Sequence, residues 1–141
     1  MRRPMVAGNW KLNGSKASIE ALLKGILASI DKVKTAEVVV CPPFVYLPMV
    51  GEKLRGSVIG VGGQDVSDQV SGAFTGEVSA SMLAEMGCKF TIVGHSERRN
   101  LYGEDDDFTA RKFAAARKQG LIPILCVGEL LAERERGVTE Q

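Results

Sequence analysis

The fold of this chain is decided by the stretch FTIVGHSERR at residues 90–99. Its first four residues form a continuous apolar run, which is typical of a strand buried in a parallel sheet. Gly94 forms a hinge after that run, and His95, the single histidine of the chain, follows with Glu97 and two arginines nearby. Such a cluster is typical of the rim of a site, but it is equally typical of a strand end that turns into a charged, solvated helix start.

Four further apolar runs flank this stretch. They span residues 5–8, 37–41, 58–62 and 121–127, and helical or mixed segments lie between them at 19–30, 44–54, about 78–86 and about 104–120. Ser15 is placed to cap the first helix, and Thr109, Phe113 and Ala116 share one side of the last one. The five runs predict an α/β fold with parallel strands, covered on both faces and joined by right-handed crossovers.

Length and composition exclude several classes of protein. The chain has 141 residues, which favours one domain spanning residues 1–141. Its 18 Lys and Arg balance 17 Asp and Glu, so no net field attracts nucleic acid or an anionic membrane. No apolar run is long enough for a membrane span or a secretory signal. Cys41, Cys88 and Cys126 lie far apart in or beside apolar runs, which predicts reduced, buried thiols and a cytoplasmic protein.

Polar residues follow the strands at the edge where parallel α/β folds bind ligands. They are Asn9 and Lys11 after the first run, Gln64 and Asp65 after the third, His95 and Glu97 after the fourth, and Glu129 after the fifth. Loops also begin at these points, so position alone leaves a functional and a structural reading open. Residues 60–65 carry two of the three glycines of a dinucleotide fingerprint but end in an aspartate, which excludes a nucleotide loop. One histidine cannot support a multi-histidine metal centre, and we expect neither a metal nor a cofactor.

Four motifs resemble the triosephosphate isomerase family. They are AGNWKLNG at residues 7–14, GAFTGE at 72–77, VGHSERR at 93–99 and CVGE at 126–129, and they stand in the family's order. The resemblance implies a partial (β/α)8 barrel, with about five parallel strands and four intervening helical segments. It makes Asn9 and Lys11 substrate-site residues, His95 the electrophile, and Glu97 a carboxylate that helps to hold Lys11.

The resemblance also implies a reaction. Triosephosphate isomerases interconvert dihydroxyacetone phosphate and glyceraldehyde 3-phosphate through an enediolate, in glycolysis and gluconeogenesis. His95 and Lys11 would supply donors to the negative oxygen of that intermediate, and the lysine ammonium would attract the phosphate. The family's glutamate base, lid loop and phosphate-binding backbone follow later strands and are not among these 141 residues, whereas a barrel of this type takes about 250 residues. We therefore expect the 141-residue chain to be inactive, or nearly so, by itself.

An open barrel creates a need for a partner. Five strands cannot close an eight-stranded barrel, so the first and fifth strands would expose unpaired backbone. The long segment Gln64–Glu77 resembles the loop that enters a neighbouring subunit in the family, and a loop of this length usually has a role. We expect a homo-oligomer built on this loop and the strand edges. The alternative is a non-catalytic oligomeric half-barrel with a structural or small-ligand-binding role. A different βα-barrel isomerase fits less well, because the motifs match one family.

Overall fold

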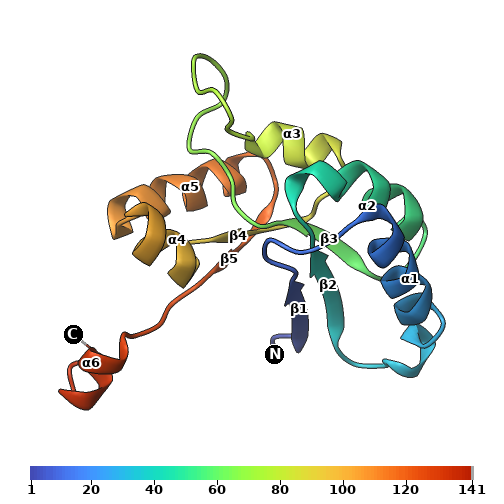
Figure 1. The fold of residues 1–141 in the computed structure, drawn as a ribbon, viewed down its shortest axis with the longest axis horizontal. Helices are drawn as coiled ribbons and strands as arrows, with labels where there is room; N and C mark the ends of the chain where they lie inside the picture. The colour runs from blue at the N-terminus through green and yellow to red at the C-terminus, as the bar shows by residue number, and fades with distance from the viewer. Residues whose placement is uncertain (141) are drawn as a thin grey trace.

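The structure is a computed structural model that describes residues 1–140, and its centre is a five-stranded parallel sheet in the order β1-β2-β3-β4-β5 (Figure 1). The strands are β1 Met5–Asn9, β2 Glu37–Cys41, β3 Gly60–Gly63, β4 Phe90–Val93 and β5 Ile122–Leu125. The α-helices are α1 Lys16–Leu27, α2 Leu47–Leu54, α3 Ala80–Glu85, α4 Ser96–Tyr102, α5 Asp106–Lys118 and α6 Leu131–Glu135. Short 3₁₀ turns lie at Ile30–Lys32 and Phe44–Tyr46. The predicted partial barrel, with a helical connection between each pair of successive strands, is confirmed.

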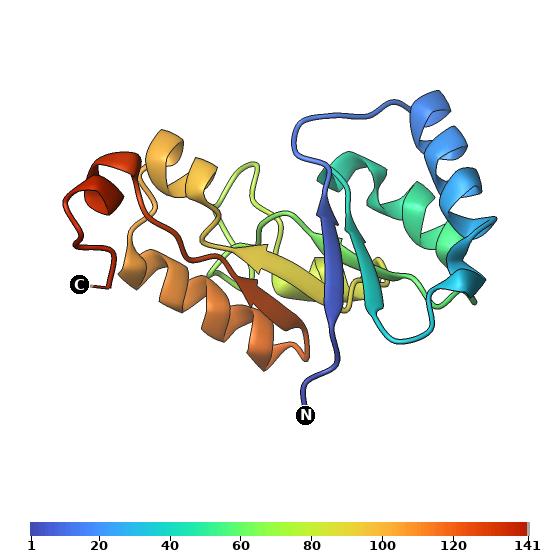
Figure 2. The same cartoon turned by 90° about the horizontal axis from the view of Figure 1, so that it is seen from below.

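The sheet is curled, and the helices lie on its outer side (Figure 2). The outer core joins side chains of α1, α2, α3 and α5 to alternate strand residues such as Val40, Val61 and Val93. The residues between them, Val39 and Ile92 among them, form a second cluster in which no helix takes part. The helices therefore cover one face of the sheet, whereas the apolar runs predicted cover on both faces. The continuous apolar runs arise because one face packs on helices and the other lines the inside of a curve.

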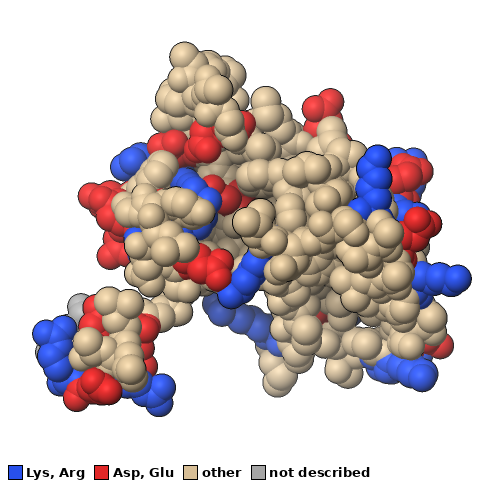
Figure 3. Space-filling view, viewed as in Figure 1, with Lys and Arg blue, Asp and Glu red and all other residues tan. Residues whose placement is uncertain are grey.

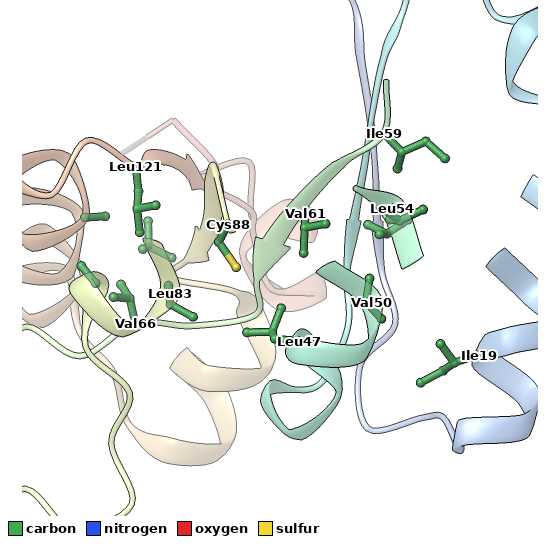
Figure 4. Close-up of a cluster of buried hydrophobic side chains, with 14 of the residues drawn as sticks. Ile19, Leu47, Val50, Leu54, Ile59, Val61, Val66, Leu83, Cys88 and Leu121 are labelled. Carbon is green, nitrogen blue, oxygen red and sulfur yellow. The ribbon is translucent and has the colours of Figure 1, made fainter. Parts of the chain in front are cut away.

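The outer cluster supplies most of the buried apolar surface (Figure 4). Val50 and Leu83 are fully buried there, and Leu121 packs at the start of β5. Ser15 begins α1 as predicted, since its Oγ accepts a hydrogen bond from the Ser18 N–H at 3.1 Å. These contacts fix the helices against the sheet and leave the carboxyl ends of the strands free to carry polar side chains.

On the concave side the Phe90 ring packs against the glycine-rich strand β3. A Cβ on Gly62 would lie 2.9 Å from the Cys41 Sγ and 3.1 Å from the Phe90 carbonyl oxygen. A Cβ on Gly60 would lie 3.0 Å from the Phe90 ring. The glycines therefore serve close packing inside the curve, which agrees with excluding a nucleotide loop here.

The two edge strands, β1 and β5, are more exposed than the central ones. Val6 of β1 is 62% exposed and Ile122 of β5 is 54% exposed, whereas Phe90 of β4 is buried. The exposed edges agree with the expectation for an open barrel. No helix within residues 1–140 combines the length and apolarity needed to cross a membrane.

Several boundaries differ from the prediction. The helix α4 begins directly after His95, and α6 follows β5 on an extended segment that stands off from the sheet (Figure 1). Both are too short to show a clear apolar period. The third strand starts at Gly60 rather than at Val58, which is 76% exposed, and the fifth spans only four of the seven residues predicted. The segment Gln64–Glu77 contains no helix or strand, as predicted, and its middle projects from the body of the molecule.

Candidate active site

His95 stands between the end of β4 and the first turn of α4. Its Nδ1 accepts a hydrogen bond from the Glu97 backbone N–H at 3.2 Å, so the imidazole acts as the N-cap of the helix. A nitrogen that accepts a hydrogen bond carries no proton, and the contact therefore fits a ring protonated at Nε2. The side chain is partly buried. His95 can thus offer one N–H donor in a fixed orientation.

Gly94 sets the direction in which the chain leaves β4. Its φ of 67° lies in the left-handed region, and a Cβ there would stand 2.6 Å from the Thr109 Cγ2. The Arg99 Nε donates to the Gly94 carbonyl at 2.8 Å, while its Nη1 pairs with Asp106 at 2.7 Å. Glycine is needed here for both the backbone angle and the space, which explains the hinge that the sequence indicated.

Lys11 and Glu97 form an ion pair at the same edge of the sheet. Their Nζ and Oε1 atoms are 2.7 Å apart, and the side chains are 54% and 43% exposed. The hydrogen bond from Lys11, with the charge of its ammonium, holds the pKa of the Glu97 carboxyl below its usual range. The other Glu97 oxygen, Oε2, lies 3.6 Å from the His95 Nδ1. Glu97 therefore holds the lysine through its carboxylate and the histidine through its backbone N–H, because an unprotonated Nδ1 has no hydrogen to donate to Oε2.

Asn9 organises the backbone that carries Lys11. Its Oδ1 accepts a hydrogen bond from the Lys11 N–H at 2.9 Å. Lys11 itself has a φ of 55°, which is unusual for a residue with a Cβ. The structure thus brings together the four site residues that the family resemblance implies. Glu97 contacts Lys11 and, through its backbone N–H, His95, and the Asn9 side chain accepts from the Lys11 N–H.

A hollow of about 660 Å³ opens beside His95. Its lining comes from the start of α4 and from the segment after β5, including Cys126 and Glu129. The Glu129 carboxylate accepts from the Thr139 hydroxyl and lies 3.6 Å from the Arg134 guanidinium. It is therefore already engaged on the far wall of the hollow. Within residues 1–140, no group of three His, Cys, Asp or Glu side chains is placed to hold a metal ion.

A second group of charges lies behind the first and was missed in the sequence. The Lys112 Nζ of α5 is 2.9 Å from the Asp65 Oδ1 and 2.9 Å from the Glu104 Oε2. Arg98 of α4 completes the group through contacts with the same two carboxylates. Burial raises the pKa of Asp65, although the hydrogen bond from Lys112 and the two cations act in the opposite direction.

One signal in the sequence could have revealed this buried group. Lys112 is three residues after Thr109 and four before Ala116, so it lies on the face that the sequence marks as buried. A lysine on such a face needs a buried acid as its partner. Asp65 was noted only as a polar residue after a strand, without a side assigned to it.

The charged side chains on one face of the molecule are mixed in sign. In Figure 3 groups of Lys and Arg and groups of Asp and Glu lie mainly around the margin of that face, with uncharged residues between them. This agrees with the balanced composition.

Comparison with known proteins gives a consistent result. Residues 4–141 match the family model described as triosephosphate isomerase. The chain is 55% identical over 141 residues to a triosephosphate isomerase of Nitrosococcus oceani and 57% identical to that of Thiobacillus denitrificans, covering 100% of this chain and 56% of each relative. A crystal structure of triosephosphate isomerase from Bartonella henselae aligns with a TM-score of 0.92 at 40% identity, covering 98% of this chain and 57% of that one. The chain spans a little over half the length of the relatives it matches.

Proposed function

Because the chain belongs to the triosephosphate isomerase family, we propose that it contributes the electrophilic half of a site that interconverts dihydroxyacetone phosphate and glyceraldehyde 3-phosphate. The observation that carries this proposal is that Glu97 contacts both Lys11, through its carboxylate, and His95, through its backbone N–H, at the carboxyl edge of the sheet. Transfer of a proton between adjacent carbons passes through an enediolate, whose negative oxygens require donors that are already in place. The site holds two such donors on different strands.

His95 supplies the first donor. Because the Glu97 N–H occupies Nδ1, the ring proton sits on Nε2. A neutral imidazole with this tautomer polarises a carbonyl oxygen by donating a hydrogen bond, and it does so without delivering a full charge to the intermediate. The N-cap contact keeps the ring from rotating, so the donor needs no reorganisation during the reaction.

Lys11 supplies the second donor and a full positive charge. Its ammonium attracts the phosphate dianion and stands near the developing enediolate. Glu97 holds the ammonium at 2.7 Å, and Asn9 fixes the backbone from which the lysine extends. Both side chains of the ion pair remain about half exposed, so a substrate can reach the lysine without breaking a buried contact.

The proton-transferring base is a separate requirement. In the family it is a glutamate after a sixth strand, and residues 1–140 contain five strands. Absence of a positioned base lowers the rate by a factor of about 10² to 10⁴. Glu129 does not replace it, since its carboxylate is engaged with Thr139 and Arg134. We therefore propose that these residues alone bind triose phosphate weakly and turn it over slowly at best.

Association with a second copy completes the proposal. Apolar side chains on the edge strands, Val6 and Ile122, are more than half exposed, as is Val70 of the projecting loop Gln64–Glu77. Exposed apolar groups beside unpaired strand edges favour self-association. The free thiols of Cys41, Cys88 and Cys126 suit a reducing compartment, and we place the activity in the cytoplasm.

The test is a binding and turnover experiment on the 141-residue chain. Titration with dihydroxyacetone phosphate should shift the NMR signals of His95 and Lys11. The variant Lys11→Met should abolish the shift of the His95 signals, while Lys16→Met, which removes an exposed lysine five residues away, should preserve it. Turnover at the rate of a complete enzyme would contradict the need for a further base.

The same experiment distinguishes this proposal from the alternative of a non-catalytic half-barrel. If the chain is folded and triose phosphate does not change its His95 and Lys11 signals, the alternative is favoured. Light scattering addresses assembly independently, and a folded monomer at micromolar concentration would contradict the proposed self-association.

A further inference from the structure

The backbone of Lys11 has an uncommon conformation. Within residues 1–140 it is the one non-glycine residue with a positive φ, at 55°. A Cβ in the left-handed region approaches the carbonyl oxygen, and lysine gains nothing locally from this arrangement. Something outside the residue must therefore hold it there.

The amide of Gln64 makes that connection. Its Nε2 donates to the Lys11 carbonyl oxygen at 2.9 Å and to the Cys41 carbonyl oxygen at 2.9 Å. Both amide hydrogens are thus used, and they join residues separated from Gln64 by 53 and 23 positions in the sequence. Gln64 follows β3 directly, and Cys41 is the last residue of β2, so the side chain ties the loop to two strands at once.

The Cys41 carbonyl oxygen is a common anchor. It also accepts the Trp10 backbone N–H at 3.1 Å. The chain is therefore held to β2 just before Lys11, and Gln64 holds it again just after the Lys11 Cα. The Lys11 N–H donates to the side chain of Asn9, the last residue of β1, so that contact holds the start of the turn, and Gln64 supplies the donor to the Lys11 carbonyl oxygen.

We propose that Gln64 is a positioning residue of this site, whose amide keeps Lys11 in the left-handed conformation that directs its ammonium to Glu97. The relevance of Gln64 to catalysis rests on the proposed function. Its effect on the conformation of Lys11 can be tested without any substrate. Without the amide, the Lys11 carbonyl loses its external donor, the turn relaxes to ordinary φ values, and the Nζ leaves the Glu97 carboxylate.

The test replaces Gln64 by methionine, which has similar length and no donor. Gln69→Met is the matched control, because Gln69 lies in the same segment and is exposed. Carbon-13 NMR titration follows the Glu97 carboxyl, and the Lys11 Cα and Cβ shifts report its backbone conformation. In Gln64→Met the Glu97 pKa should rise toward its ordinary value of 4.5, and the left-handed shifts of Lys11 should disappear. Gln69→Met should change neither.

The measurement separates positioning from a merely structural role. A residue that only stabilises the strand ends would lower the unfolding midpoint while leaving the Glu97 titration and the Lys11 shifts as in the original chain, and that result would overturn the inference. If Gln64→Met does not fold, Gln64→Asn keeps an amide but is one methylene too short to reach both carbonyls. It should show the same two changes, and its failure to do so would equally overturn the inference.

Binding of dihydroxyacetone phosphate distinguishes this inference from the proposed function. Loss of the placed ammonium should weaken binding about tenfold or more in Gln64→Met. Displacement of Lys11 without triose phosphate binding to the original chain would support the role of Gln64 and count against the isomerase proposal. If the original chain binds triose phosphate but Gln64→Met leaves the Lys11 and Glu97 signals unchanged, the isomerase proposal would be supported and the role of Gln64 would be overturned.

Discussion

Two groups of charges meet at the carboxyl edge of the sheet, and they use the same kinds of side chain for different purposes. The site group consists of Asn9, Lys11, His95 and Glu97, and the buried group consists of Asp65, Arg98, Glu104 and Lys112. Lys11 of the site group is 54% exposed, whereas Lys112 of the buried group is 1% exposed. The first ion pair can be approached by a ligand, and the second only joins elements of the fold.

The two groups are built from adjacent positions in the chain. Glu97 faces the site and Arg98 the buried group, while Gln64 reaches the Lys11 loop and Asp65 reaches Lys112. A strand end or a first helical turn presents successive side chains in different directions. At these two places, a residue that serves the site is followed by one that ties the same segment to the interior. The difference between the two groups shows that the segments carrying Glu97 and Gln64 are held in place by buried contacts of the next residue in the sequence.

The pKa values of Glu97 and Asp65 shift in opposite directions. The hydrogen bond and charge of Lys11 lower the pKa of the exposed Glu97. Burial raises the pKa of Asp65 even though Lys112 and Arg98 lie beside it. Ion pairing prevails where water remains, and desolvation prevails where it has been excluded.

The largest expected effect follows from removing the cation at the centre of the buried group. Lys112→Met should lower the free energy of unfolding by about 3–5 kcal/mol, because Asp65 and Glu104 then share Arg98 alone in a desolvated place. Urea denaturation measures this change. Lys118→Met, on the exposed side of the same helix, should change stability by less than about 0.5 kcal/mol. Equal effects of the two substitutions would show that the buried group is not structural.

The hinge between the two groups should give the next largest effect. Gly94→Ala introduces both a left-handed alanine and a Cβ placed 2.6 Å from the Thr109 Cγ2. Gly103→Ala introduces the left-handed alanine alone, because φ is 69° there and the space is open. Each backbone strain costs about 1–3 kcal/mol. Thermal unfolding should therefore place Gly94→Ala below Gly103→Ala, and the reverse order would rule out crowding at the hinge.

A pH series compares the carboxylates directly, beginning with Asp65. A raised pKa means that the folded chain binds the Asp65 proton more tightly than the unfolded chain. The original chain should therefore lose stability relative to Asp65→Asn as the pH rises upward from 3.8, the ordinary value for this group. The difference can change by at most about 1.4 kcal/mol per pH unit, since one proton is involved. Urea midpoints across this range measure it, and a difference independent of pH would contradict the raised pKa.

The smallest effect is expected at the exposed pair, with the opposite sign. The lowered pKa of Glu97 means that its contribution to stability is present above 4.5 and is lost as the pH falls through the folded-state value. Relative to Glu97→Gln, the original chain should weaken on acidification. Because the pair is half exposed, 0.5 M NaCl should remove most of the difference. A contribution that survives high salt would place Glu97 among the buried charges instead.

The sequence predicted the parts of this molecule that depend on local pattern. Five apolar runs, the Ser15 cap and the histidine after the fourth strand all have a local physical cause, and the structure contains each of them. The resemblance implied a barrel interior, but the local pattern does not distinguish the concave face of the sheet from the face under the helices. The residues of the concave face are as apolar as those under the helices, and only the curl of the whole sheet decides which face a helix covers.

Only part of the site could be predicted, because local pattern identifies residues but not the long-range contacts between them. Asn9, Lys11, His95 and Glu97 were identified from the motifs, but their mutual distances depend on long-range register. Lys112 was not identified because its helix contains several other charged residues. Nothing in the sequence indicates which two carbonyl oxygens the Gln64 amide binds. A backbone carbonyl is present at every residue, so residue type does not show which carbonyls a distant side chain will bind. The residues that position the site were therefore harder to predict than the site residues themselves.

The sheet order described above also bears on how the chain folds. Each strand from β2 to β5 pairs with the strand that precedes it in the chain. Paired residues are 21 to 32 positions apart in the sequence: Val39 and Gly60 are the nearest example, and Met5 and Glu37 are as far apart as any. Closing segments of this length costs little additional chain entropy as the sheet grows. A nascent chain leaving the ribosome can therefore add one strand at a time to a template already present, and no strand must wait for a later one before it finds a neighbour.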